Sequence, residues 1–138
     1  DTGIDDLSIA SRFTGRRVLL AEDDEINREV ALALLEDSGL RIDLAENGEE
    51  AVSAAARTDY DLILMDMQMP RLDGLEATRR IRRLARGSQV PIIAMTANAF
   101  AEDKVRCLDA GMDDFLPKPA NPETVYATLV KWLEPPKA

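Results

Sequence analysis

The chain has 138 residues, 46% of them hydrophobic and 31% charged, which is the size and composition of one soluble domain with a single core. Its 26 acidic and 17 basic residues give a formal net charge of −9, which argues against binding to the nucleic acid backbone. The single cysteine excludes an internal disulfide, and no apolar run approaches the ~20 residues that span a bilayer. We therefore expect a cytoplasmic domain that contacts neither nucleic acid nor membrane, although its parent protein can be membrane-anchored.

The first fifteen residues differ from the rest of the chain. Residues 1–15 are polar, lack a sustained period and do not resemble a signal peptide. We interpret them as a linker or as the edge of a piece cut from a longer protein, and residues 16–138 as one folded domain.

From Arg16 onward, short apolar runs alternate with segments of helical periodicity. The first run, Val18–Ala21, predicts a strand. Apolar residues at helical spacing then predict a helix that stops at Gly39, namely Ile26, Val30, Ala33 and Leu34. The later predicted strands are 40–45, 61–66, 90–96 and a short strand within 113–119. The later predicted helices are Gly48–Arg57, Leu75–Ala85, Asn98–Ala110 and Glu123–Leu133.

Five repeats of strand and helix predict an α/β fold, a doubly wound parallel sheet with helices on both faces. The runs "VLLA", "LILM" and "IIAM" are almost continuously apolar, as expected for central strands covered on both sides. Ligands of such sheets bind beyond the carboxyl ends of the strands, so the residues that follow each strand are the candidates for function.

Polar side chains follow four of the predicted strands: Glu22 with Asp23, then Asp66, Thr96 and Lys118. Clustered carboxylates repel one another unless they hold protons or a hard cation, and Mg²⁺ prefers such oxygen ligands. A magnesium site with open positions, together with the charge of Lys118, suits a phosphoryl group. Asp66 is the candidate nucleophile, since carboxylates form phosphoryl adducts.

Four segments carry a family resemblance: "LLAEDD", "LILMDMQMPRLDG", "IIAMTANAF" and "DDFLPKP". In order and spacing they resemble the response-regulator receiver domains, from Arg17 to the last helix, and most closely those of hybrid histidine kinases. The resemblance implies a flavodoxin-like (βα)5 fold with strand order 2-1-3-4-5.

The same resemblance implies roles for individual residues. Asp66 accepts the phosphoryl group, Asp23 binds Mg²⁺ directly, and Glu22 does so through water. The backbone carbonyl of Gln68 is a further ligand. Thr96 and Lys118 contact the phosphoryl oxygens, Phe115 is the aromatic switch residue coupled to Thr96, and the peptide bond from Lys118 to Pro119 is cis.

Some polar residues have simpler interpretations. Glu25 is interpreted as an acid of the first helical turn that complements the helix dipole, while Asp24 either does the same or adds charge to the site. Cys107 is expected to be a small buried residue and Trp132 to cover the sheet edge. The arginines between the third and fourth strands are expected to form a solvated face rather than a docking patch: Arg79, Arg80, Arg82, Arg83 and Arg86.

The expected function is a phosphorylation switch of a two-component or phosphorelay system. A magnesium-dependent hydrolase of the haloacid dehalogenase kind is the enzymatic alternative, but it needs an aspartate two residues after the nucleophile, where this chain has Gln68. A third possibility is a receiver-like module that only docks to a partner. The expected chemistry is limited to the domain's own phosphotransfer and dephosphorylation.

The chain contains no histidine, so the phosphoryl donor must lie elsewhere. We expect a histidine kinase domain or a histidine phosphotransfer domain as partner, and the C-terminal receiver of a hybrid histidine kinase as the context. A stand-alone single-domain regulator is the alternative for this context, and a weak homodimer is left open.

Overall fold

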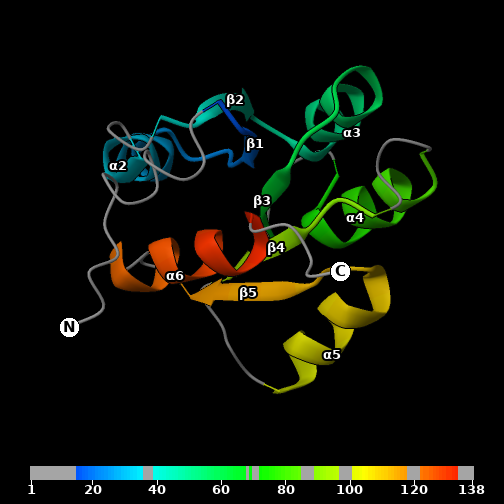
Figure 1. The fold of residues 1–138 in the computed structure, drawn as a ribbon. Coiled ribbons are helices and arrows are strands. Elements are labelled where there is room, and N and C mark those ends of the chain that lie inside the picture. Colours follow the sequence, from blue (N-terminus) through cyan, green and yellow to red (C-terminus); the bar gives the residue numbers. More distant parts are fainter. Residues whose placement is uncertain are drawn as a thin grey trace, which may run out of the picture.

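The structure is a computed structural model that describes residues 15–35, 39–67, 69, 72–84, 89–96, 101–117 and 122–133. These residues form five strands and five helices that alternate along the chain (Figure 1). The strands are β1 (Arg17–Ala21), β2 (Arg41–Ala45), β3 (Leu62–Asp66), β4 (Ile92–Thr96) and β5 (Asp114–Pro117). The helices are α2 (Glu25–Leu35), α3 (Gly48–Arg57), α4 (Gly74–Arg82), α5 (Ala101–Ala110) and α6 (Pro122–Leu133).

The strands form one parallel sheet in the order β2-β1-β3-β4-β5, which confirms the predicted topology. Chain order reverses between β1 and β3, because β2 lies outside β1 while all later strands lie on the other side. In sheets of this kind a ligand binds beyond the carboxyl ends of the strands at this reversal. The topology therefore points to the end of β1 and the end of β3.

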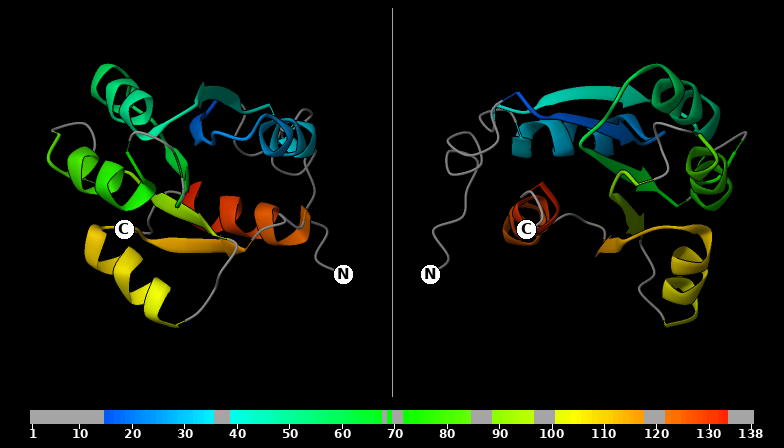
Figure 2. Two further views of the ribbon diagram at one scale, coloured as in Figure 1. Left: turned by 180° about the vertical axis from the view of Figure 1, so that it is seen from behind. Right: turned by 45° about the vertical axis from the view of Figure 1, so that its right-hand side comes forward.

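Helices cover both faces of the sheet (Figure 2). One core cluster joins alternate strand residues, such as Ile63 and Ala94, to helices α3, α4 and α5. The other cluster joins the intervening residues, such as Leu64 and Ile93, to α2 and α6. All residues of β3 and β4 are buried, as the continuous apolar runs predicted, so the strand ends are held in a rigid frame.

Helix α2 buries a different face from the one that its apolar periodicity suggested. Of the residues that carried this pattern, Ile26 and Val30 are 69% and 47% exposed, and Ala33 is exposed as well. Leu34, the fourth residue of the pattern, is partly buried, and the helix packs through it, Ala31 and the buried Leu35 against one core cluster. The prediction of a helix is confirmed, but an apolar stripe remains in solvent.

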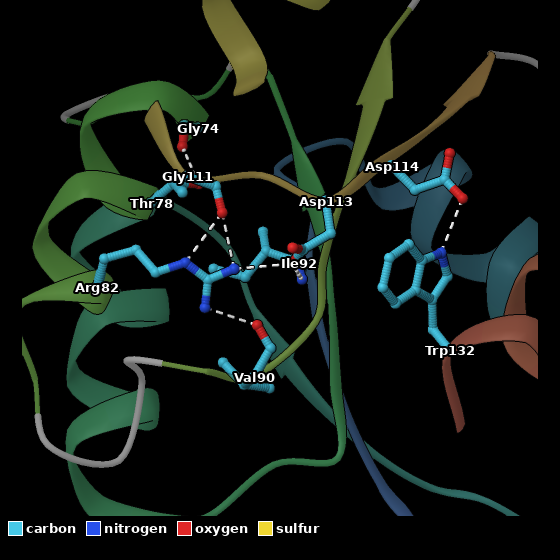
Figure 3. A network of polar contacts seen from close by, with 9 residues as sticks. All are labelled: Gly74, Thr78, Arg82, Val90, Ile92, Gly111, Asp113, Asp114 and Trp132. Carbon is cyan, nitrogen blue, oxygen red and sulfur yellow. Dashed lines mark hydrogen bonds and ion pairs between the residues drawn. The ribbon is translucent and has the colours of Figure 1, made fainter. Parts of the chain in front are cut away.

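The expectation of a solvated arginine face was wrong for Arg82. Its guanidinium donates to the carbonyl oxygens of Gly111 at 2.7 and 2.9 Å and of Val90 at 2.6 Å, and it pairs with Asp113 at 2.7 Å (Figure 3). Asp113 also accepts the backbone N–H of Ile92. Arg82 thus ties the end of α4 to the segments that lead into β4 and β5. Arg79, Arg80 and Arg83 are exposed as expected, and Arg86 lies outside the described residues.

The last helix confirms its predicted stripe, since Val125, Leu129 and Leu133 are buried. Trp132 covers the edge strand as expected, and its indole N–H donates to Asp114 of β5 at 2.7 Å (Figure 3). Within the described parts of the chain, every helix is too short or too polar to span a lipid bilayer.

Candidate functional site

Three carboxylates meet where the strand order reverses. Glu22 and Asp23 directly follow β1, and Asp66 is the last residue of β3. Because Ala21 pairs with Met65 in the parallel register, the residues one step further along the two strands are brought side by side. One carboxylate oxygen from each of Glu22, Asp23 and Asp66 lies within 4.8 Å of the others. The predicted acidic cluster is therefore present.

The cluster fits a magnesium ion by its donor set and its burial. Glu22 and Asp66 are only 2% and 3% exposed, while Asp23 is exposed. Two buried carboxylates at this separation repel each other in a medium that screens charge poorly, so a hard divalent cation would relieve an unfavourable arrangement. The exposed Asp23 places one side of the cluster in contact with solvent. A ligand can reach the cluster from that side.

The backbone beneath Glu22 and Asp23 is held by a residue that the sequence analysis did not single out. Arg28, in the first turns of α2, donates to the carbonyl oxygens of Glu22 at 2.9 Å and Asp23 at 3.0 Å. Asp24 caps the same helix by accepting the N–H groups of Ile26 and Asn27, which favours a role at the start of the helix over added charge at the site. A basic residue inside a helix gives no sequence signal for contacts of this kind.

A close approach of α4 fixes the backbone around Asp66. A Cβ on Gly74 would overlap the carbonyl oxygen of Asp66 and lie 3.0 Å from the Cα of Met67, so only glycine fits without a shift. Gly74 also donates its N–H to the carbonyl of Met67, whose own N–H donates to Met95 of β4. The thiol of Cys107, buried as predicted, contacts the Met67 sulfur at 3.2 Å. Met67, the residue after Asp66, is thus contacted from β4, α4 and α5.

Thr96 is the last residue of β4, the strand next to β3, and is 8% exposed. Phe115 lies on β5, partly buried against the cluster that α3, α4 and α5 cover. Two further predicted site residues, Lys118 and Gln68, lie outside the described residues, and so does the predicted cis bond to Pro119. Of the predicted site residues, the structure therefore describes Glu22, Asp23, Asp66 and Thr96 together at the carboxyl ends of β1, β3 and β4.

Comparison with known sequences identifies the family. The sequence model of the response regulator receiver domain matches residues 18–130. The two-component response regulator ORR41 of Oryza sativa subsp. japonica is 48% identical over 120 residues, which cover 84% of this chain and 93% of that protein. Hybrid signal transduction histidine kinase B of Dictyostelium discoideum is 43% identical over 126 residues, covering 83% of this chain. The chain spans only 6% of that kinase and 16% of probable histidine kinase 1 of rice.

Solved structures agree with this result. The receiver domain of the sensor histidine kinase PA1611 from Pseudomonas aeruginosa, with magnesium coordinated in its active site cleft, superposes with a TM-score of 0.82 at 45% identity. The match covers 87% of this chain and 98% of that one. The receiver domain of Ssk1 from Saccharomyces cerevisiae, crystallised with the histidine phosphotransfer protein Ypd1, gives 0.81 at 33% identity and covers 87% and 90%. In fold, sequence and arrangement of the strand ends, this chain belongs to the response regulator receiver domain family.

Proposed function

We propose that this domain is a phosphorylation switch that accepts a phosphoryl group on Asp66 with Mg²⁺ held by Glu22 and Asp23. The observation that carries the proposal is the meeting of three carboxylates within 4.8 Å at the strand-order reversal, with Asp66 buried at the end of a central strand. Bound Mg²⁺ would supply the positive charge that offsets both the carboxylates and the phosphoryl oxygens.

In the proposed reaction, a carboxylate oxygen of Asp66 forms a bond to phosphorus. The phosphorus–nitrogen bond of a phosphohistidine donor breaks, and the released imidazole nitrogen takes up a proton. The rigid surroundings of Asp66 position its carboxylate for in-line attack, which is the main contribution a protein makes to this chemistry. Gln68 is proposed as a further metal ligand and Lys118 as the cation that pairs with the phosphoryl group.

The proposed switch runs through Thr96 and Phe115. A phosphoryl group on Asp66 offers oxygens that accept a hydrogen bond from the Thr96 hydroxyl, and a Thr96 side chain drawn toward them leaves space on its other side. Phe115 has no hydroxyl, so packing alone decides whether its ring fills this space. Its partly buried position against the core cluster is compatible with such a movement.

The proposal is tested by labelling with a small phosphodonor such as acetyl phosphate. We expect label on the wild-type chain only in the presence of Mg²⁺, and none on Asp66→Asn. Asp24→Asn is the matched control, because it neutralises an acid beside the cluster that caps α2 instead. Persistent labelling of Asp66→Asn, or equal labelling with a chelator present, would contradict the assignment.

We further propose that the histidine-bearing partner docks on the exposed stripe of α2. The helix begins two residues after Asp23, and Ile26 and Val30 lie one turn apart on its solvent face. A partner covering this stripe would bring its histidine to the open side of the carboxylate cluster. The Ssk1 receiver, which is similar to this chain, was crystallised with such a partner, Ypd1.

Comparing a protein donor with a small phosphodonor separates the effect of a mutation on docking from its effect on the phosphorylation chemistry. Replacing Ile26 or Val30 by Gln should slow transfer from a phosphorylated histidine phosphotransfer protein by roughly tenfold, because the complex loses the burial of one aliphatic side chain. Labelling by acetyl phosphate should stay unchanged. Leu108→Gln, a similarly exposed apolar residue on α5, is the control. Equal loss with both donors, or with the control, would show that α2 is not the docking face.

The context we propose is a receiver within a hybrid histidine kinase in the cytoplasm, with a stand-alone regulator as the alternative. Similarity to the PA1611 receiver and to the Dictyostelium kinase favours the first, and similarity to ORR41 supports the second. The reading frame around this segment decides between them, because a hybrid kinase carries a phosphorylatable histidine and an ATP-binding domain in the same chain.

A further inference from the structure

A cation lies over the ring of Phe115. The Nζ atom of Lys104, on α5, is 5.8 Å from the centroid of this ring on β5. Lys104 is exposed, whereas Phe115 is partly buried. An ammonium within about 6 Å of a ring centroid is attracted by the negative face of the ring. Lys104 therefore stabilises Phe115 in the position that the structure shows.

The ring lies on the same side of the sheet as Thr96. Phe115 pairs with Ala94, and Thr96 pairs with Pro117, so each strand contributes two residues that are separated by one position. Side chains at such spacing point to the same face of a sheet. Ala94 and Phe115 both belong to the cluster under α3, α4 and α5. A ring that moves toward Thr96 therefore slides along this face, away from the solvent side of α5.

The backbone of Phe115 is held in place from the opposite side. Asp114 accepts the N–H of Phe115 at 2.8 Å. Its second oxygen accepts the indole N–H of Trp132 at 2.7 Å (Figure 3). Lys131 adds an ion pair with the same carboxylate at 3.6 Å. Because the backbone is fixed in this way, the ring of Phe115 can move only by rotation about its side-chain torsions. Such a rotation changes its contact with Lys104.

We propose that Lys104 is a positioning residue that retains Phe115 at the α5 surface and so opposes the switch driven by phosphorylation of Asp66. This inference rests on the proposed function and on the inward movement of the ring. The Lys104 ammonium cannot follow the ring inward without losing its water. From the strength of exposed cation–π contacts, Lys104 shifts the balance between the two ring positions by about two- to fivefold.

The sign of the effect distinguishes this role from general electrostatics. Beryllofluoride is an anionic mimic of the phosphoryl group, so removing a nearby positive charge should by itself weaken its binding. Removing a contact that retains the ring should instead make binding tighter, because binding of the mimic then no longer has to break the contact between Lys104 and Phe115. The two explanations predict opposite changes in affinity.

The test is a beryllofluoride titration of the full 138-residue chain with Mg²⁺, followed by the amide resonances in NMR spectra. We expect Lys104→Met to bind beryllofluoride about two- to fivefold more tightly than the wild type. Lys104→Arg should behave like the wild type, since a guanidinium also lies favourably over a ring. In a Phe115→Leu background, the change at Lys104 should have no effect on affinity, because the ring is missing.

Unchanged or weaker binding by Lys104→Met would overturn the inference, as would an equal gain in the Phe115→Leu background. These results leave the proposed function standing, because the wild type would still bind beryllofluoride with Mg²⁺. Absence of binding by the wild type would overturn both.

Discussion

Tyr60 shows how one residue links the stability of this domain to pH. Its hydroxyl donates to Asp43 at 2.7 Å, and the same carboxylate oxygen lies 3.3 Å from the Arg17 guanidinium. Burial and, next, the bond to Asp43 raise the pKa of Tyr60 from 10.0 to about 12. Both effects favour the neutral phenol, because an ionised ring would face a carboxylate in a less polar site.

The raised pKa predicts a loss of stability in alkali. The contribution of the neutral Tyr60 is fully present below pH 10 and is lost as pH rises through about 12, because the unfolded chain releases this proton first. Urea unfolding across this range should show the wild type more stable than Tyr60→Phe below pH 10, with the difference shrinking as pH rises. Groups common to both proteins cancel in this comparison. A difference that stays constant would show that Tyr60 is not the titrating group.

Individual site residues differ in how well the sequence predicts them. Asp66, Glu22 and Asp23 were predictable because their position depends only on where two strands end and on the neighbours those strands have. Arg28 and Gly74 were not, since their roles depend on a side chain folding back on a loop and on a helix approaching a strand end. Such contacts are set by tertiary packing, which leaves no periodic trace in the sequence.

At the scale of elements, α4 illustrates the same difference. Its helical pattern was evident, but Arg82 was grouped with its solvated neighbours because a run of arginines usually faces water. Its side chain is only 19% exposed, and it satisfies the carbonyl groups of Gly111 and Val90 at the end of the sheet remote from the carboxylate cluster. The periodicity predicted that α4 exists, and not what the end of α4 contacts.

Loss of this anchor should destabilise the whole domain. We expect Arg82→Met to lower the free energy of unfolding by about 2 to 4 kcal/mol, because Asp113 and the carbonyl groups lose their donor in a partly buried place. Arg79→Met is the matched control on the same helix. Its ion pair with Glu76 is exposed, so we expect a change of at most about 0.5 kcal/mol. Equal losses in urea unfolding would mean that Arg82 has no special structural role.

At the scale of the whole molecule, the alternation of strands and helices predicted the class of fold, and the four motifs predicted the strand order. The sequence could not predict which face of α2 would be buried. Its apolar residues surround more of the helix than one stripe, and only packing against β1, β3 and α6 selects Leu35 over Ile26. The exposed stripe that results is the basis of the proposed docking face.

Magnesium binding should appear in the stability of the entire domain, because the three carboxylates are brought together only when β1 and β3 pair. A ligand that binds only the folded state adds about 2.7 kcal/mol to the free energy of unfolding at 100 times its Kd. We expect Mg²⁺ to raise the stability of the wild type in this way. Asp23→Asn should lose most of the gain.

Two features of the chain make this experiment decisive. The net charge of −9 means that any salt stabilises the protein by screening, so Mg²⁺ must be compared with NaCl at equal ionic strength. Asp23→Asn also removes one of three mutually repelling charges, so without metal it should be at least as stable as the wild type. If Mg²⁺ and NaCl stabilise the wild type equally, or if Asp23→Asn keeps the full magnesium effect, the cluster is not the metal site. If instead Asp23→Asn is at least as stable as the wild type without Mg²⁺ and gains no stability from it, the result supports the metal site. It would also show that repulsion among the three carboxylates destabilises the metal-free domain and that Mg²⁺ relieves this repulsion.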